Sequence, residues 1–305
     1  MATLGQYVLY NNEILPAAEA QLSVASSAVL YGLSVYSVFF AKHKPESMLA
    51  FRIPEHLTRL IQSARMIGLN GAEQFVEDKT FTEQIEKLIA ANKPTTDQFF
   101  RLTVHATELV PGVKTADLEL SFSVFMYEAE PILPADGVRL KTSLWRRTAD
   151  SAIPARAKVN GAYVNSALAK QDALDAGFDD CLFLNHNGYV SELSAANVFM
   201  VKRGELITPD CASDILEGIT RRSILELAAQ HNIPVVERKV ALTELYTADE
   251  VFACGTSAFV AAISEVDGRI INGNTTGPIT TTLRNALTHA QQDTENAWVH
   301  TLPLG

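Results

Sequence analysis

The stretch from residue 143 to residue 180 reads SLWRRTADSAIPARAKVNGAYVNSALAKQDALDAGFDD. Lys158 stands in it among small residues, after Ile153-Pro154 and before a predicted helix at 165–176. A buried lysine is poorly solvated, which lowers the pKa of its amine and allows the amine to form a Schiff base. The phenol of Tyr163 lies five residues on and could reach the same place across a turn. Taken alone, the pattern also fits an ordinary solvated lysine.

Three other short segments contain residues that the patterns of strands and helices do not explain. Gly218 leads directly into a predicted helix at 220–230, and the free amides and dipole of a helix start suit a phosphate. The turn CGTSA at 254–258 is small and rich in hydroxyls after a predicted strand, which suits an anion. Glu192 opens a run of small residues after the turn at 185–188. Each segment alone also fits a bland interpretation: a capped helix, a plain turn and a solvated acid.

Outward from this region, the patterning predicts two α+β domains, the second richer in strands. The stretch EAEPILPADG at 128–137 has the prolines, acids and glycine of a linker, giving domains at 1–127 and 138–305. In the first domain we expect a strand from Val29 to Phe40, interrupted at Gly32, and a helix at 54–69. The remaining expected elements are a hairpin at 7–15, helices at 80–92 and 278–291, and strands at 98–105, 118–127, 138–145, 180–185, 197–201, 206–208, 235–240 and 251–253.

The composition excludes several classes of protein. The 305 residues include 35 acidic and 25 basic side chains, a net charge of −10, which argues against nucleic acid or an anionic membrane as the main partner. A local cluster of donors could still bind a small anion. Hydrophobic residues make up 47% and charged residues 20%, as in ordinary globular proteins rather than disordered ones.

The cysteines and the N-terminal residues indicate in which cellular compartment we expect the protein. Cys181, Cys211 and Cys254 lie far apart without a CxxC spacing, which suggests neither a metal site nor a disulfide framework. We read no signal peptide in MATLGQYVLYNNEILP and no apolar run of the ~20 residues that a membrane helix needs. We therefore expect a soluble cytoplasmic protein.

Taken together, these motifs indicate more than each does alone. In their order and spacing they resemble the fold-type IV (class IV) pyridoxal-phosphate-dependent aminotransferases, most closely the bacterial branched-chain amino acid aminotransferases. The resemblance is dense from about residue 138 to residue 280 and implies a two-domain α+β fold, a small α/β domain plus a larger β-rich pseudo-barrel domain. It rests on EHLTRL at 55–60, the stretch at 143–180, NGYVSELSAANVFMV at 187–201, ITPDCASDILEGITRRSILELA at 207–228 and ELYTADEVFACGTSA at 244–258.

The resemblance implies roles for these residues. Lys158 would bind pyridoxal 5'-phosphate as a Schiff base and then shuttle a proton. Glu192 would pair with the pyridine nitrogen, and Tyr163 would hydrogen-bond the ring hydroxyl oxygen. The phosphate would be held by Arg59, by the backbone of Ile219 and Thr220, and by Thr256. Backbone groups of Thr256, Ser257 and Ala258 would lie near the substrate carboxylate.

The first domain departs from the family pattern His-Tyr-Gly-x-x-x-Phe-Glu-Gly-Ile-Arg. Here residues 30–40 read LYGLSVYSVFF, so Tyr31 is kept and Tyr36 replaces the phenylalanine. Ser37 replaces the glutamate and Phe40 replaces the arginine, which removes a charged pair.

A second departure lies on a later strand, where the family's Tyr-x-Arg becomes Phe99-Phe100-Arg101. A phenol that helps to hold the substrate carboxylate is gone, and the arginine stays. Tyr31, Tyr36, Phe99 and Arg101 are therefore candidates for substrate contact. The aromatic members equally fit core positions.

The leading hypothesis is an aminotransferase that moves the amino group of an apolar, branched-chain-like L-amino acid to 2-oxoglutarate by a ping-pong mechanism. Two alternatives keep the fold and cofactor: a D-amino acid or (R)-amine transaminase, and a lyase resembling aminodeoxychorismate lyase. A non-catalytic binding protein on the same scaffold is a third. The expected partners are amino acid and keto acid substrates, and the resemblance implies a homodimer or higher homo-oligomer.

Overall fold

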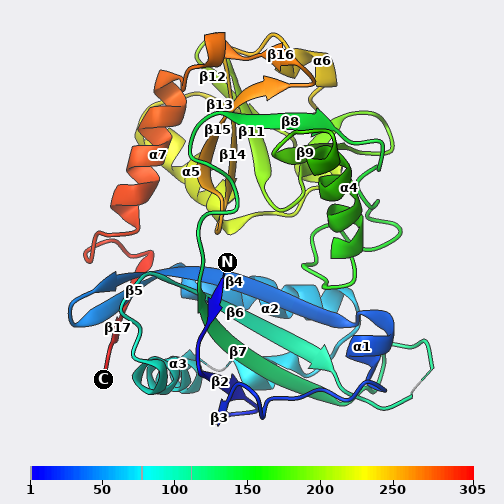
Figure 1. Cartoon of the computed structure of the whole chain (residues 1–305), viewed down its shortest axis with the longest axis vertical. Helices are drawn as coiled ribbons and strands as arrows, with labels where there is room; N and C mark the ends of the chain where they lie inside the picture. Colours follow the sequence, from blue (N-terminus) through cyan, green and yellow to red (C-terminus); the bar gives the residue numbers. More distant parts are fainter. Residues whose placement is uncertain (1, 77, 111) are drawn as a thin grey trace. The chain divides into compact units, whose positions relative to one another are not determined.

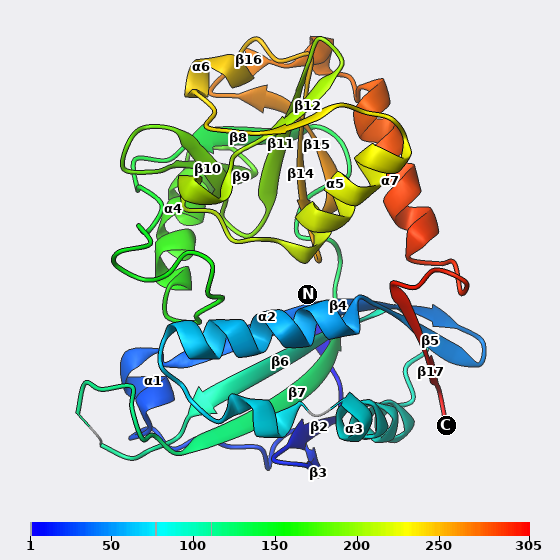
Figure 2. The ribbon, with the colours of Figure 1, turned by 180° about the vertical axis from the view of Figure 1, so that it is seen from behind.

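The computed structural model describes residues 2–76, 78–110 and 112–305 of the chain. The chain divides into two compact units. Unit 1 comprises Met1–Glu130, Ala157–Ala162 and Ala290–Gly305, and unit 2 comprises Pro131–Arg156 and Tyr163–His289. Each unit combines helices with a sheet (Figures 1 and 2), which confirms the α+β two-domain class. The short segment around Lys158 belongs to unit 1.

Unit 1 is built on an antiparallel sheet with the strand order β17-β5-β4-β6-β7-β2-β3, and β1 pairs with β7. Side chains alternate between its two faces, so Ser37, Phe39 and Phe100 share one face while Tyr36 and Arg101 share the other. The strands are β1 (Thr3–Leu4), β2 (Tyr7–Tyr10), β3 (Glu13–Pro16), β4 (Ser34–Lys44), β5 (Ser47–Phe51), β6 (Gln98–Ala106), β7 (Leu120–Glu128) and β17 (Val299–Pro303).

The helices of unit 1 are α1 (Ser27–Tyr31), α2 (Ile53–Met66), η1 (Ala72–Phe75) and α3 (Asp78–Asn92). The helix α2 packs on β4 and β6 (Figure 2) and has Pro54 in its first turn. Its buried face includes the apolar residues Leu57 and Leu60, together with the polar residues His56 and Ser63. The helix therefore brings hydrogen-bonding groups, as well as apolar ones, against the sheet.

The prediction of a strand beginning at Val29 was wrong. Ser27–Tyr31 form α1 instead, and β4 begins at Ser34. A short apolar run does not distinguish strand from helix by its pattern. Gly32 ends α1 with a φ of +68°, and a Cβ at this position would lie 2.8 Å from the Cα of Gly161. Glycine is thus required here both by the left-handed turn and by the close approach of the chain just after Lys158.

Unit 2 contains a second, curled sheet with the strand order β10-β9-β8-β15-β14-β11-β12-β13, and β16 pairs with β15. The pairs β8–β9, β8–β15 and β12–β13 are parallel, and the others are antiparallel. The strands are β8 (Val138–Thr142), β9 (Asp180–Leu184), β10 (Val190–Leu193), β11 (Asn197–Lys202), β12 (Glu205–Thr208), β13 (Val235–Glu237), β14 (Glu250–Gly255), β15 (Phe259–Val266) and β16 (Arg269–Ile270).

The helices of unit 2 cover this sheet, which is why β9 and β14 are buried along almost all of their length. The helix α4 packs on β8 and β9, and α5 packs on β13 and β14 (Figure 1). Phe199 and Phe252 stack with ring centres 5.1 Å apart between β11 and β14. The helices are α4 (Tyr163–Asp175), η2 (Cys211–Ser213), α5 (Ile219–Gln230), α6 (Leu242–Leu245), η3 (Asn272–Asn274) and α7 (Pro278–Ala290).

The three cysteines are free thiols. Cys181 and Cys254 are buried in unit 2, and burial raises the pKa of Cys254 to about 12. These thiols therefore behave as small apolar core groups. Across the described residues, no helix combines the length and apolarity needed to span a bilayer.

Candidate active site

The residues predicted to carry the chemistry lie on both units. Unit 1 carries Tyr31, Tyr36, Arg59, Phe99, Arg101 and Lys158, and unit 2 carries Tyr163, Glu192, Ile219, Thr220, Thr256, Ser257 and Ala258.

In unit 1, the backbone around Lys158 is paired with the first residues of β4. The Tyr36 N–H donates to the Lys158 carbonyl at 3.0 Å, and the Asn160 N–H donates to the Ser34 carbonyl at 2.8 Å. The Lys158 N–H donates to Ser63 Oγ of α2 at 3.1 Å. Lys158 is therefore fixed by both the strand and the helix, although it lies outside any regular element.

The side chains around Lys158 gather on the ring of Tyr36. Lys158 Nζ lies 4.8 Å from the centre of this ring, and Arg101 Cζ lies 3.7 Å from it. Arg101 also donates from Nη2 to Asn160 Oδ1 at 3.1 Å. The quadrupole of an aromatic ring attracts cations, although the ring carries no net negative charge. Unit 1 thus places the predicted lysine beside two of the predicted substrate residues, and the positive charge favours an anionic ligand.

The other two substrate candidates differ in their surroundings. Phe99 lies two residues before Arg101 on the same face of β6 and is 3% exposed. Its ring centre lies 5.5 Å from those of Phe40 and Tyr127. Phe99 is therefore part of a packed aromatic row next to Arg101. Tyr31 is 40% exposed in the last turn of α1.

Arg59 projects from α2 toward β4, where its Nη2 donates to Ser37 Oγ at 3.0 Å. Ser37 Oγ also lies 2.9 Å from Nδ1 of His56, which is buried. Burial, and then the positive charges of Arg59, Lys158 and Arg52, hold the pKa of His56 well below its usual value. No role for Ser37 or His56 was predicted from the sequence. The available signal was that His56 and Arg59 lie one turn apart on α2 and off its apolar stripe.

In unit 2, the Glu192 carboxylate is buried and accepts hydrogen bonds from several donors. It accepts from Arg147 Nε at 2.9 Å, from Asn197 Nδ2 at 3.0 Å and from the Leu216 N–H at 3.1 Å. Arg147 and Asn197 are themselves buried. The ion pair and the amides fix the carboxylate in one orientation and compensate its charge. Arg147 and Asn197 were not predicted, because they meet Glu192 only through the fold.

Asn197 connects Glu192 to the start of α5. Its Nδ2 also donates to the Leu216 carbonyl at 2.9 Å. A Cβ at Gly218 would lie 2.1 Å from Asn197 Oδ1, so only glycine fits at this N-cap. Gly218 supplies no side-chain cap, which leaves the first-turn amides of Ile219 and Thr220 without the usual capping oxygen. An anion at this helix start would satisfy them.

The turn after β14 lies beside the same region of unit 2. Asn197 and Cys254 are register partners between β11 and β14, and a Cβ at Gly255 would lie 3.4 Å from the Ala195 carbonyl oxygen. The residues that follow are Thr256, Ser257 and Ala258, and the Ser257 carbonyl accepts from the Ile132 N–H at 2.9 Å. Unit 2 therefore gathers Glu192, the start of α5 and this turn at one end of its sheet. Tyr163 is the first residue of α4.

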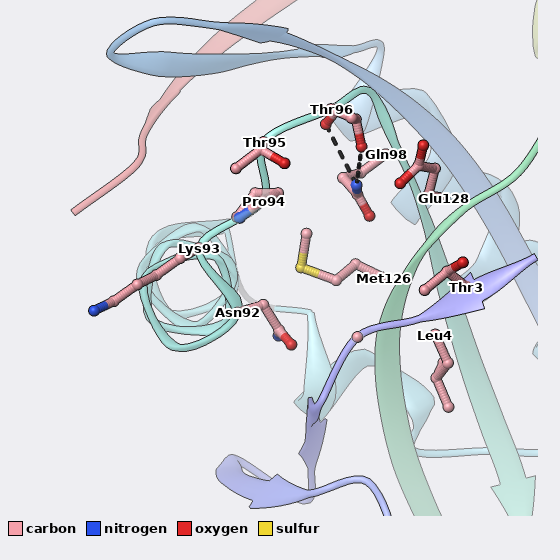
Figure 3. Close-up of a pocket in the computed structure, with 11 residues that line it drawn as sticks. Thr3, Leu4, Asn92, Lys93, Pro94, Thr95, Thr96, Gln98, Met126 and Glu128 are labelled. Atoms are coloured by element: carbon pink, nitrogen blue, oxygen red, sulfur yellow. Dashed lines mark hydrogen bonds between the residues drawn. The ribbon is translucent and has the colours of Figure 1, made fainter.

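A separate cavity of about 190 Å³ lies in unit 1, at the end of α3 and the start of β6 (Figure 3). Gln98 Nε2 there donates to the carbonyl and the hydroxyl of Thr96. Its other lining residues are Thr3, Leu4, Gly5, Asn92, Lys93, Pro94, Thr95, Met126 and Glu128. The lining contains none of the predicted site residues, so this cavity is not the candidate active site.

The pairing of Glu192 predicts a large difference between two neighbouring arginines. Arg147→Met removes the ion pair between Arg147 and the buried Glu192 carboxylate, and we expect a loss of about 3–5 kcal/mol in the free energy of unfolding. Arg146→Met removes the same charge from an exposed position and should change it by less than about 0.5 kcal/mol. Urea denaturation of both variants measures this. Equal midpoints for the two would show that Arg147 does not compensate Glu192.

Known proteins resemble this chain over nearly its full length. The model of the family "Amino-transferase class IV" matches residues 39–266. A "Probable branched-chain-amino-acid aminotransferase" of Synechocystis sp. is 35% identical over 97% of this chain and 96% of its own length.

Solved structures agree in fold. The branched-chain aminotransferase of Thermoproteus uzoniensis, crystallised with norvaline, superposes with a TM-score of 0.91 at 30% identity, covering 99% of this chain and all of that one. A T.th. branched-chain amino acid aminotransferase complexed with N-(5'-phosphopyridoxyl)-L-glutamate has a TM-score of 0.86 at 31% identity, covering 97% of this chain and 98% of that one. The curled sheet of unit 2 and the α+β pattern of both units match these structures, and the chain belongs to the class IV aminotransferase family.

Proposed function

We propose that this chain uses pyridoxal 5'-phosphate to transfer the amino group of an apolar, branched-chain-like L-amino acid to 2-oxoglutarate, by a ping-pong mechanism. The observation that carries the proposal is the Lys158 amine, held against the Tyr36 ring beside the Arg101 guanidinium. The names of the relatives support an apolar amino donor. The phosphopyridoxyl-glutamate complex of one of them supports glutamate and 2-oxoglutarate as the second pair.

The donor groups within each unit fit the parts of this cofactor. The Arg59 guanidinium, the uncapped amides of Ile219 and Thr220 and the hydroxyl of Thr256 would hold the phosphate. The fixed Glu192 carboxylate would accept a hydrogen bond from the protonated pyridine nitrogen and keep that nitrogen protonated. The Tyr163 hydroxyl would donate to the ring hydroxyl oxygen. When bound, the cofactor supplies an electron sink for the negative charge that develops at the α-carbon of the substrate.

Lys158 is the catalytic residue of the proposal. Its Nζ would attach the cofactor covalently. Once the substrate amine has displaced it, the free Lys158 amine would accept the proton of the substrate α-carbon and deliver it to C4′ of the cofactor. A proton carrier must be held close to both atoms, and the three backbone hydrogen bonds that fix the Lys158 segment support this role.

Arg101 would bind the carboxylate of the substrate. Its guanidinium is oriented by the Tyr36 ring and by Asn160 Oδ1, and the turn Thr256–Ala258 would add backbone donors. Phe99 has no hydroxyl, so it would contribute an apolar surface instead of a hydrogen bond. An apolar wall beside a guanidinium favours an α-carboxylate with an aliphatic side chain.

Removal of Lys158 should abolish both covalent attachment and turnover. Lys158→Ala is expected to lose the visible absorbance of the protein-bound cofactor, and borohydride should no longer leave cofactor mass on the protein. Lys114→Ala, at an exposed position of unit 1, should keep both. Absorbance spectra and intact mass after reduction measure the outcome. Full turnover by Lys158→Ala would contradict the proposed mechanism.

The substrate is tested by a panel of single half-reactions, in which enzyme is mixed with one amino compound and the cofactor spectrum is followed. We expect L-leucine, L-valine, L-isoleucine and L-glutamate to convert the cofactor with one equivalent of keto acid. Conversion by D-amino acids or (R)-amines alone would replace the proposed donor. Continuous release of pyruvate would identify a lyase.

We also propose that the enzyme is at least a homodimer. An exposed apolar patch in unit 1 supports this, and it includes Val24, Val29, Leu30, Leu109 and Val113. Its two segments are joined because the Ser27 N–H donates to the Glu108 carbonyl and the Val110 N–H donates to the Ala25 carbonyl. Apolar patches of this kind mark protein interfaces.

The patch gives a direct test of assembly. The wild-type protein should have a solution mass of at least twice the 33.3 kDa of the chain. Leu109→Asp should lower that mass, because a charge is costly to bury in an apolar interface. Ile270→Asp, at an exposed residue of β16, is the matched control and should not lower the solution mass. Light scattering after size exclusion measures all three. A monomeric wild type would contradict the proposal.

A further inference from the structure

A chain of hydrogen bonds runs from Arg59 through Ser37 to His56, between α2 and β4. The roles of donor and acceptor follow from the groups themselves. A guanidinium only donates, so Ser37 Oγ accepts from Arg59 Nη2 at 3.0 Å. The single hydrogen of the Ser37 hydroxyl can then be donated to His56 Nδ1, which lies 2.9 Å away. This direction requires that Nδ1 carries no proton.

The surroundings of His56 keep its imidazole neutral. Burial is the first cause of its lowered pKa, and the positive charges of Arg59, Lys158 and Arg52 act in the same direction. Arg52 and Arg59 lie at the start of the same helix or on it, and the Lys158 backbone N–H donates to Ser63 of that helix. A charged His56 would repel Arg59 and would reverse the hydrogen bond to Ser37. The neutral ring is therefore the form that completes the chain.

Both anchoring residues are rigid. Ser37 is fully buried in β4, where it pairs with Leu102 of β6. His56 is 2% exposed, and its ring packs at 6.2 Å from that of Phe39. A long arginine side chain loses rotamer entropy when it is fixed on a ligand, and a rigid anchor reduces that loss at the moment of binding. The anchor also adds no negative charge, so it does not neutralise the guanidinium.

We propose that Ser37 and His56 are positioning residues that preorganise the Arg59 guanidinium for the phosphate of the cofactor. The proposal rests on the proposed function, because it takes Arg59 as a phosphate ligand. At position 37 the resembled family pattern has glutamate. Here a serine accepts the hydrogen bond of Arg59, and a neutral histidine accepts that of the serine.

Ser63 provides a matched comparison on the same helix. It is also fully buried, and its hydroxyl donates to the Arg59 carbonyl at 2.8 Å and accepts from the Lys158 N–H at 3.1 Å. Ser63 therefore acts on the backbone of Lys158, whereas Ser37 acts on the guanidinium of Arg59. Loss of Ser63 should affect any ligand that Lys158 binds, with or without a phosphate.

The experiment compares two ligands that differ only in the phosphate. Cofactor-free protein is titrated with pyridoxal 5'-phosphate and, separately, with pyridoxal, and the Kd of each is measured from absorbance. Ser37→Ala should raise the Kd for pyridoxal 5'-phosphate about tenfold or more and leave that for pyridoxal within about twofold. Ser37→Thr keeps the hydroxyl and should restore affinity. Ser63→Ala should weaken both ligands by similar factors.

His56 is tested in the same assay. His56→Leu removes the acceptor that orients the Ser37 hydroxyl and should weaken pyridoxal 5'-phosphate selectively, by less than Ser37→Ala. The double variant should be no weaker than Ser37→Ala alone, because both act through one chain. If Ser37→Ala does not fold, Ser37→Cys keeps a similar volume with a weaker hydrogen bond and gives the same comparison.

The outcomes separate this inference from the proposed function. If the wild-type protein binds no pyridoxal 5'-phosphate, the proposed function fails and this inference fails with it. If the wild type binds it and Ser37→Ala is unchanged, or weakens pyridoxal to the same extent, the positioning role alone is wrong. A loss of affinity for pyridoxal 5'-phosphate alone, restored by Ser37→Thr, supports the positioning role.

Discussion

The pairing of residues 158–160 with the start of β4 is the constraint on which the candidate site of unit 1 depends. The register of β4 with β5 runs from Ala41 to Lys44, so β5 does not reach the first residues of β4. The segment around Lys158 occupies that edge through its hydrogen bonds to Ser34 and Tyr36. A lysine outside regular structure thereby gains the positional precision of a strand. The close approach of Gly32 and Gly161 shows how tightly the two segments fit.

Consecutive residues of β4 then serve different purposes, because side chains alternate across a strand. Tyr36 points to the face where Lys158 and Arg101 meet its ring. Ser37 points to the opposite face, where α2 supplies Arg59 and His56. One strand therefore positions the Lys158 amine and the Arg101 guanidinium through Tyr36, and the Arg59 guanidinium through Ser37. A shift of the register by one residue would exchange the two faces and separate both groups from their anchors.

Individual residues show how far the sequence could predict this arrangement. Lys158 and Glu192 could be proposed as site residues because small, non-periodic segments around them had no evident packing role. Arg147 and Leu216 could not be connected to Glu192, because they meet it from distant segments of the chain. The helix α1 was mistaken for a strand because its apolar residues fit either pattern, and β10 was missed because its four residues are all buried and do not alternate. In each case the tertiary context overrode a weak local preference.

The two units anchor their charged groups in opposite ways. The buried carboxylate of Glu192 receives a full cation from Arg147, because an uncompensated buried anion would destabilise the fold. Arg59 is a half-buried residue, and its guanidinium donates to a neutral hydroxyl. Arg101 is likewise oriented by a neutral ring and an amide oxygen. A neutral anchor fixes the direction of a cation and adds no negative charge of its own. An acidic chain can therefore present a local positive potential for a phosphate or a carboxylate, since a ligand responds to the charges near it more than to the net charge of the chain.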